Sequence, residues 1–298
     1  MKKILVTGGT GFIGWNLCNY LLQKGLDVYA TSNGCGNLPH KKVKLLNKNY
    51  SGLDLKNYNF DCVYHTSAIN DTQINDFYSL NDINVNDTKY IFNECYKNGC
   101  RKFIYSSSTA VYGNSESPYI ENKTPFDPLT FYALSKINME KFANEFYKDK
   151  KDALVIGLRY CNVYGFGEFH KNKRSSMIHQ LLMNKIFNKK SLIFKDGEQK
   201  REWVYVEDVA EANYLASISN KSEIYNVGSE ECVSFNELLD LIKIKSFEYI
   251  DCPFKETYQN YTKSNIDKIK NELGYSPKKS LKSNIINLEL RLRNHYNV

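Results

Sequence analysis

The sequence predicts an α/β protein with a doubly wound parallel sheet and a smaller mixed lobe in its C-terminal half. Short apolar runs alternate with helical patterns over residues 1–160, which is typical of parallel sheets covered by helices. A glycine-rich turn joins the first apolar run to the first helical pattern. Beyond Gly165 the alternation becomes irregular, so a second unit is expected there.

The expected strands are short apolar runs bounded by polar or turn-forming residues. They cover residues 3–7, 27–31, 42–46, 62–65, 102–106 and 153–159. Helical patterns follow at 11–24, 86–97 and 132–147. Together these segments predict a nucleotide-binding domain over residues 1–165.

The second unit is expected to be a smaller mixed lobe built from residues 166–202 and 217–298. Its expected elements are helices at 177–187, 235–242, 264–273 and 281–294, and a short strand at 203–206. A segment near residues 203–216 is expected to return to the first domain. The absence of a low-complexity linker predicts that the two lobes pack closely, with substrate between them.

The glycines of the first turn have the G-x-x-G-x-x-G spacing, with Gly8, Gly11 and Gly14 between strand and helix. Glycine permits a tight turn and a close approach of backbone to phosphate, and the helix start offers free N–H groups to that phosphate. Phe12 and Ile13 begin the helix beside them. The arrangement predicts a Rossmann-type domain that binds a dinucleotide through these five residues.

The second strand ends in Thr31-Ser32-Asn33-Gly34, the region that usually contacts the adenosine ribose of a dinucleotide. Neither a carboxylate nor an arginine stands there. Ser32 can hydrogen-bond a ribose hydroxyl or a 2′-phosphate, and Asn33 lies beside it. The sequence therefore leaves NAD and NADP open.

A serine run and a Tyr-x-x-x-Lys motif predict the chemistry. Tyr132 and Lys136 are four residues apart, so they share one face of a helix. A neighbouring ammonium is expected to lower the tyrosine pKa, which is ordinarily about 10, so that Tyr132 can take a hydroxyl proton. Ser108 ends the run after the fifth strand and can hold the same oxygen. Tyr132 and Lys136 are also expected to contact the cofactor.

Several stretches resemble the extended short-chain dehydrogenases that act on nucleotide sugars. They are Thr7-Gly8-Gly9-Thr10-Gly11-Phe12-Ile13-Gly14, Ser106-Ser107-Ser108-Thr109-Ala110-Val111-Tyr112-Gly113, Tyr132 to Lys136, Leu158-Arg159-Tyr160-Cys161-Asn162-Val163-Tyr164-Gly165, Arg201-Glu202-Trp203-Val204-Tyr205-Val206-Glu207-Asp208-Val209-Ala210 and Tyr225-Asn226-Val227-Gly228. The resemblance covers essentially the whole chain. It implies a Ser108, Tyr132 and Lys136 triad, Asn162 beside the sugar or diphosphate, and Arg201 paired with the diphosphate.

The resemblance also narrows the reaction. Dehydratases of this family carry Asp-Glu after the catalytic hydroxyl, where this chain has Thr109-Ala110, so loss of water is not expected. The stretch Glu168-Phe169-His170-Lys171, followed by Ser175-Ser176-Met177, resembles nucleotide-heptose 6-epimerases. In those enzymes the lysine is a second acid/base, which implies this role for Lys171, with His170 and Met177 beside the substrate. The match departs at Asn172-Lys173-Arg174, where one glycine is expected.

Bulk properties exclude several classes. The net charge of +7 comes from scattered lysines, so nucleic acid is not expected as a partner, and no apolar run is long enough to span a membrane. The eight cysteines form no C-x-x-C pair and only five scattered histidines are present, which favours reduced thiols, a cytoplasmic enzyme and no metal site. In relatives, helices corresponding to residues 86–97 and 132–147 form a dimer seam, which implies a homodimer.

The leading hypothesis is an NAD(P)-dependent epimerase of a nucleotide-linked heptose that passes through a keto or aldehyde intermediate, with the dinucleotide tightly bound. A net C4 dehydrogenase or a 4-epimerase of a nucleotide-linked heptose or hexose is the alternative within the family. A dinucleotide-sensing binding protein is the alternative of another class. The presence of both Tyr132 and Lys136 favours an enzyme over this last hypothesis.

Overall fold

A computed structural model describes residues 1–46, 53, 55–254 and 256–298 of the chain. Its centre is a seven-stranded sheet in which every neighbouring pair is parallel, in the order β10-β6-β5-β4-β1-β2-β3. The strands are β1 Lys3–Thr7, β2 Asp27–Thr31, β3 Lys44–Leu46, β4 Cys62–His65, β5 Lys102–Ser108, β6 Leu154–Tyr160 and β10 Ile224–Val227. The order runs outward in both directions from β1 and β4, which places the expected ligand crevice where these two strands end.

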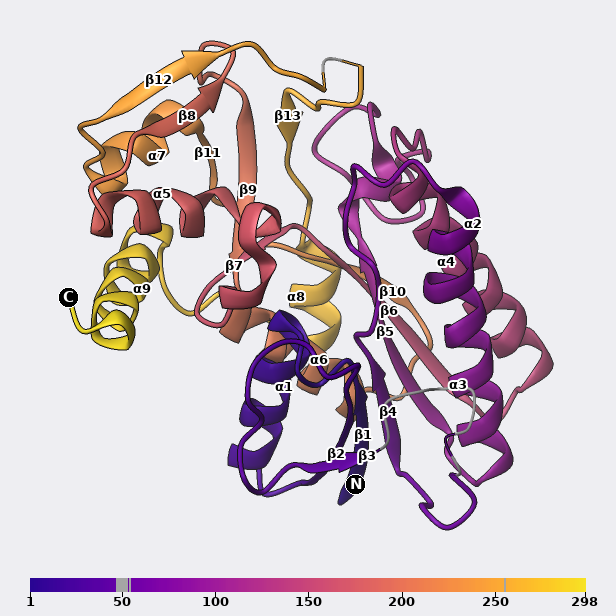
Figure 1. The fold of residues 1–298 in the computed structure, drawn as a ribbon. Helices are drawn as coiled ribbons and strands as arrows, with labels where there is room; N and C mark the ends of the chain where they lie inside the picture. The colour runs from indigo at the N-terminus through magenta and orange to yellow at the C-terminus, as the bar shows by residue number, and fades with distance from the viewer. Residues whose placement is uncertain (47–52, 54, 255) are drawn as a thin grey trace.

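Helices cover both faces of this sheet (Figure 1). One face carries α1 Phe12–Gln23, α6 Val206–Ile218 and α8 Asp267–Leu273, and the other carries α3 Asp87–Lys97 and α4 Phe131–Asp149. Side chains alternate along β1 accordingly: Ile4 and Val6 join the first core, and Leu5 joins the second. The short α2 Phe77–Asn81 packs on α4, and a π-helical turn, Asp82–Asn86, joins α2 to α3.

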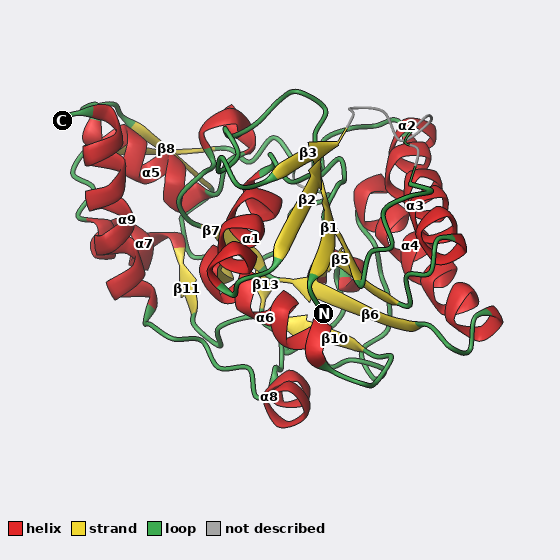
Figure 2. Cartoon of the chain, turned by 90° about the horizontal axis from the view of Figure 1, so that it is seen from below, coloured by secondary structure: helices red, strands yellow, loops and turns green. Residues whose placement is uncertain are grey.

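The second lobe packs against the carboxyl ends of the central strands (Figures 1 and 2). One small sheet contains β7 Asn162–Tyr164, β9 Lys200–Tyr205, β11 Cys232–Ser234 and β13 Tyr261–Thr262, and β8 Ser191–Phe194 pairs with β12 Phe247–Ile250. Its helices are α5 Met177–Ile186, α7 Phe235–Ile242 and α9 Leu281–Tyr296. They share one core, which includes the buried side chains of Trp203, Leu238 and Ile285.

The predicted α/β sheet is confirmed, with small shifts of its element bounds. Strand β5 continues to Ser108 because residues 106–108 pair with residues 158–160 of β6. Strand β3 begins only at Lys44, since the amides of Lys42 and Val43 bond back to His40. The strand expected at 203–206 spans Lys200–Tyr205, and its last predicted residue begins α6.

Part of the segment 217–298, which is expected in the second lobe, packs with the sheet domain instead. Strand β10 pairs in parallel with residues 157–160 of β6, and its Tyr225 is fully buried in the same core as Ile266 and Ile269 of the α8 region. A four-residue strand between irregular segments has too little periodicity to predict its sheet. The sequence predicts that residues 217–298 belong to the second lobe. In the structure, residues 224–227 and 267–273 pack with the central sheet instead.

Candidate active site

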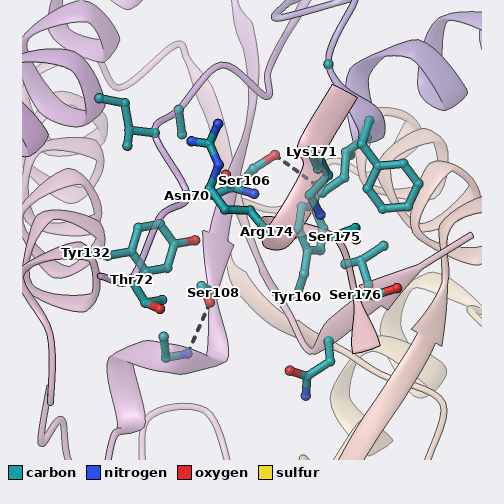
Figure 3. A pocket seen from close by; sticks show the side chains of 18 of the residues that line it. Asn70, Thr72, Ser106, Ser108, Tyr132, Tyr160, Lys171, Arg174, Ser175 and Ser176 are labelled. Carbon is teal, nitrogen blue, oxygen red and sulfur yellow. Dashed lines mark hydrogen bonds between the residues drawn. The ribbon is translucent and has the colours of Figure 1, made fainter. Parts of the chain in front are cut away.

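A cavity of about 960 Å³ lies between the carboxyl ends of the central strands and the second lobe. Every residue predicted to contact cofactor or substrate lines this cavity, although these residues are spread from Gly8 to Arg201 along the chain. Figure 3 shows Tyr132, Ser108 and Thr72 on one side and Lys171, Ser175 and Ser176 on the other, with Arg174 extending between them. The topology thus brings the predicted residues together.

The glycine turn forms a cradle that side chains would fill. Gly8 has φ of +67°, and a Cβ there would lie 2.9 Å from the Ser67 Cα. A Cβ on Gly14 would lie 2.3 Å from the Gly8 carbonyl oxygen. Gly11 begins α1 with no side-chain cap, so the first N–H groups of the helix stay available at the cavity wall. This cradle suits a pyrophosphate.

The loop after β2 is shaped by its own polar side chains. The Ser32 hydroxyl lies 2.8 Å from the Thr10 hydroxyl and accepts the Gly34 N–H at 3.0 Å, while Oδ1 of the Asn33 side chain accepts the Cys35 N–H at 3.0 Å. Ser32 and Asn33 both line the cavity. Their polar atoms therefore hold the loop against the glycine turn as well as facing the expected ribose position.

The cofactor-side wall carries Ser108, Tyr132 and Lys136, with Ser108 at the end of β5 and the other two in the first turns of α4. The buried Lys136 donates from Nζ to the Ser106 carbonyl oxygen at 2.8 Å, and this Nζ lies 5.8 Å from the centre of the Tyr132 ring. Thr130 caps α4 by accepting the Ala133 N–H at 3.1 Å. Tyr132 and Lys136 therefore start from a fixed helix end.

The expected lowering of the Tyr132 pKa does not hold in this structure. Burial raises the pKa of Tyr132, and the hydrogen bond with Ser108 opposes that rise only in part. The Lys136 ammonium is turned toward the Ser106 carbonyl, and burial lowers the Lys136 pKa to about 8, with the Glu140 carboxylate opposing this change. Desolvation thus outweighs the charge effect that the motif predicts.

The lobe-side wall carries Lys171 and His170 on the 3-10 helix Phe169–Arg174. Lys171 Nζ lies 3.1 Å from Oε2 of Glu168, whose carboxylate is fully buried and also accepts the N–H and the hydroxyl of Ser176, each at 2.6 Å. Burial, followed by the Lys171 charge, lowers the pKa of His170. One carboxylate thus joins Lys171 to the start of α5.

The substrate-side end of the cavity contains Arg201, Asn162 and Met177. Arg201 is 9% exposed and donates to the carbonyls of Lys200 and Gln259, with its guanidinium 5.0 Å from the centre of the Tyr258 ring. None of the described carboxylates pairs with it, and burial lowers its pKa. A buried guanidinium in this state is suited to an anion.

Strand pairing places Asn162 on the strand next to the one that carries Arg201. The chain leaves β6 at Cys161 and continues as β7, whose Asn162 lies opposite Trp203 of β9. Asn162 donates from Nδ2 to the Glu202 carbonyl at 2.9 Å. Met177 begins α5 on the same side.

Among the described residues, the charged side chains that line the cavity all belong to lysine or arginine. Its described lining includes four cationic side chains, those of Lys136, Lys171, Arg174 and Arg201, and no aspartate or glutamate. A cavity of this kind favours ligands that carry several negative charges.

Some lining residues were not predicted. Residues 66–70 follow β4, and the rule that ligands bind at the carboxyl ends of parallel strands could have found them. Arg174 ends a 3-10 helix, Phe194 ends β8 and Tyr258 lies in a loop of the second lobe, and the sequence offers no comparable signal for any of the three.

The described residues contain no group of three or more His, Cys, Asp or Glu side chains placed to hold a metal ion. Within the same residues, no helix combines the length and apolar character that crossing a bilayer requires.

Comparison with known proteins identifies relatives along the whole chain. The sequence profile of the NAD dependent epimerase/dehydratase family matches residues 4–228. An ADP-L-glycero-D-manno-heptose-6-epimerase of Brachyspira hyodysenteriae is 32% identical over 288 residues, which cover 90% of each chain.

Solved structures of epimerases are also similar to this chain. The ADP-L-glycero-D-manno-heptose-6-epimerase of Helicobacter pylori is 30% identical, with a TM-score of 0.88 over 98% of this chain and 96% of that one. The UDP-glucuronic acid 4-epimerase of Bacillus cereus, solved with UDP-glucuronic acid and NAD, is 25% identical, with a TM-score of 0.85 over 99% of this chain and 100% of that one.

Proposed function

Because the chain belongs to the NAD dependent epimerase/dehydratase family, we propose that it is an NAD-dependent epimerase of a nucleotide-linked heptose. The proposed substrate is a nucleotide-diphosphate sugar, and the proposed reaction inverts its C6 centre through a transient carbonyl. The two heptose 6-epimerases among the relatives support this choice of sugar.

One observation carries the proposal: two candidate acid/base groups stand on different walls of one cavity. Tyr132 lies on the cofactor side, and Lys171 lies on the second lobe, held by the buried Glu168. Inversion requires proton transfer at the substrate oxygen for hydride delivery to either face of the carbon. A net dehydrogenase needs only one such group.

The residues that line the cavity fit NAD. Gly8, Gly11 and Gly14 would hold the pyrophosphate in a cradle whose close backbone packing leaves no room for a Cβ on Gly8 or Gly14. Ser32 and Asn33 would lie beside the adenosine ribose, and Lys136 beside the nicotinamide half. When bound, NAD accepts a hydride from carbon and can return it.

The chain's own residues would manage the proton and the reacting oxygen. Ser108 would hold the substrate hydroxyl, and Tyr132 would take its proton, with the Lys136 ammonium turned from the Ser106 carbonyl toward Tyr132 to favour the phenolate. Lys171 would serve the carbonyl oxygen when the opposite face of the carbon is turned toward the nicotinamide. Arg201 and Asn162 would hold the diphosphate and sugar, with His170 and Met177 beside the sugar.

The second candidate is an enzyme that acts at C4. It is either a dehydrogenase, which oxidises without inversion, or a 4-epimerase. Ser108, Tyr132 and Lys136 would serve either reaction, so only the position of Lys171 and the heptose-specific relatives favour the 6-epimerase. The residues after Ser108 are Thr109 and Ala110, so the cavity offers no carboxylic acid at the position where the family's dehydratases protonate a leaving group.

We further propose that the sheet domain binds NAD while the second lobe binds the nucleotide sugar, in a cytoplasmic homodimer. The expected dimer seam consists of α3 and α4. Large apolar side chains near it are exposed, including Tyr78 at 84%, Phe131 at 39% and Tyr147 at 38%. Burial of such side chains would favour association of two copies.

The test is a panel of nucleotide sugars, followed by nicotinamide absorbance and by NMR of the products. A stereoisomer formed without net change of absorbance is the expected result. Net accumulation of reduced nicotinamide and a ketone would instead favour the dehydrogenase. Binding of NAD with no conversion of any sugar would overturn both and favour a binding protein.

A further inference from the structure

A buried ion pair lies behind the cofactor-side wall, outside the cavity lining. Arg159 of β6 donates from Nη2 to Oε2 of Glu140 at 2.7 Å and from Nε to Oε1 at 2.9 Å. The two side chains are only 5% and 8% exposed. Such a pair is costly to desolvate and does not by itself stabilise a fold strongly. Fold stability therefore does not account for its presence here.

This ion pair contacts the segment that carries the catalytic serine. The Ser107 hydroxyl donates to Oε1 of Glu140 at 2.5 Å. Ser107 stands between Ser106, whose carbonyl accepts the Lys136 ammonium, and Ser108, which lines the cavity. The Glu140 carboxylate therefore fixes the end of β5 against α4.

Arg159 supports the same segment from its other end. It donates from Nη1 to the Tyr112 hydroxyl at 2.7 Å, and Tyr112 ends the 3-10 helix Thr109–Tyr112 that Ser108 caps. Tyr112 in turn donates to Oδ1 of Asn226 at 2.8 Å. The pair thus connects α4, β5, β6 and β10 around the three predicted catalytic residues.

Glu140 also lies one helical turn after Lys136, so the two side chains share a face of α4. The groups that face Lys136 are Tyr132 and Glu140 from its own helix, Ser106 from β5 and His65 from β4. Burial, followed by the Lys136 charge, lowers the pKa of His65 to about 3, so His65 is neutral. Glu140 is the anion of this set.

We propose that Glu140, oriented by Arg159, is a positioning residue that holds Ser108 against Tyr132 and supplies the negative charge that stabilises the Lys136 ammonium. This inference rests on the proposed function, because it assigns Lys136 its role. Glu140 contacts neither cavity nor substrate and acts through Ser107 and Lys136.

The sign of the charge gives a sharp test. We would follow the protonation of Lys136 in the protein alone by NMR of its ¹³Cε during a pH titration, with Lys136→Arg to assign the signal. The wild-type midpoint is expected near pH 8. Glu140→Gln removes the negative charge and keeps the size, so the midpoint should fall by about 0.5–1 pH unit. Arg159→Met removes the positive charge, so the midpoint should rise.

A role in packing alone would not move the two midpoints in opposite directions. Unchanged midpoints, or shifts of the same sign, would overturn the proposal. The matched control is Glu289→Gln, which breaks the Lys185 pair at 2.7 Å in the second lobe and should leave the Lys136 midpoint in place.

If a single variant fails to fold, the double variant Glu140→Gln/Arg159→Met avoids an unpaired buried charge. Its midpoint should still fall, by less than in Glu140→Gln, because Glu140 shares a helix face with Lys136 while Arg159 lies beyond it. An unchanged midpoint in the double variant would also overturn the proposal. The titration needs no substrate, so its outcome is independent of whether the panel of nucleotide sugars supports the proposed function.

Discussion

The two walls of the cavity are built in different ways. The cofactor-side wall places its chemistry on regular elements: Ser108 ends a strand that pairs along its length with β6, and Tyr132 and Lys136 lie in a capped helix. The lobe-side wall places Lys171 on a short 3-10 helix that is interrupted at Asn172, with φ of 49° and ψ of −125°. Regular secondary structure fixes the first wall, whereas side-chain contacts fix the second, including bonds from Asn16 to the Phe166 carbonyl and from Asn37 to the Gly167 carbonyl.

The lobe-side wall is held by one carboxylate and by contacts with both lobes, among them Lys171 Nζ at 4.9 Å from the centre of the Phe12 ring. Glu168 joins Lys171 to Ser176, and Phe169 stacks on His295 of α9 with ring centres 4.2 Å apart. The lobe-side wall is therefore joined both to the second lobe and to α1 of the sheet domain. The comparison shows that Tyr132 lies in a regular element, whereas Lys171 lies in an interrupted 3-10 helix that contacts between the lobes hold in place.

The largest expected effect tests the cofactor-side wall. Tyr132→Phe should lower turnover by at least about 10²-fold, because general-base catalysis typically contributes about 10²–10⁴-fold. Dinucleotide affinity should change little, since the glycine cradle is untouched. Tyr225→Phe, which removes a buried hydroxyl outside the cavity, is the matched control. Near-normal turnover of Tyr132→Phe would remove this tyrosine from the mechanism.

The next largest effect distinguishes the role of the lobe-side wall from that of the cofactor-side wall. Lys171→Met should abolish inversion while leaving the initial oxidation detectable as reduced nicotinamide on the protein, measured by absorbance in a single turnover. Lys173→Met, on the same 3-10 helix but exposed and outside the cavity lining, should retain inversion. If Lys171 only neutralises a diphosphate, KM will rise with kcat nearly unchanged, and the two-wall interpretation is wrong.

A smaller effect is expected at the substrate end. Arg201→Ala should weaken nucleotide-sugar binding by about 10–150-fold, because a hydrogen bond to a charged group contributes about 1.5–3 kcal/mol. Calorimetry should show a smaller loss for NAD. Arg293→Ala, which removes an arginine of α9 outside the cavity, serves as the control. Equal losses for both ligands would place Arg201 outside the sugar-nucleotide site.

The smallest effect is expected where the two sides meet. Arg174 of the lobe lies 3.8 Å from Asp71 of the loop after β4, and its side chain is 55% exposed. Exposed ion pairs of this kind contribute about 0.2–1 kcal/mol, so Arg174→Ala should change KM by no more than about fivefold. A loss larger than that of Lys171→Met would show that this exposed cation, and not Lys171, dominates the lobe-side wall.

The same contrast explains what the sequence could predict. The glycines, Ser108, Tyr132 and Lys136 lie at fixed positions of strands and helices, so local spacing was enough to place them. The part played by Glu168 required knowing that it is fully buried and meets both Lys171 and Ser176. The raised pKa of Tyr132 likewise depends on burial, which a motif does not encode.

The local sequence did not reveal where strand β10 and Arg174 lie in the fold. Strand β10 is four residues long, and its place in the central sheet is decided by pairing with β6, more than sixty residues earlier in the chain. The position of Arg174 depends on the backbone at Asn172, which has an unusual conformation that the sequence alone does not reveal. In both cases tertiary contacts determine the outcome.

The cationic cavity has a consequence for the order in which ligands leave. Both ligands of the proposed reaction carry diphosphates, so each occupies part of the same positive field, and the described lining adds no negative side chain. Whichever ligand binds first weakens the field that the other meets, and the coupling between the two binding equilibria is therefore antagonistic and reciprocal. The field therefore favours neither ligand to leave first, and each is released more readily while the other is bound.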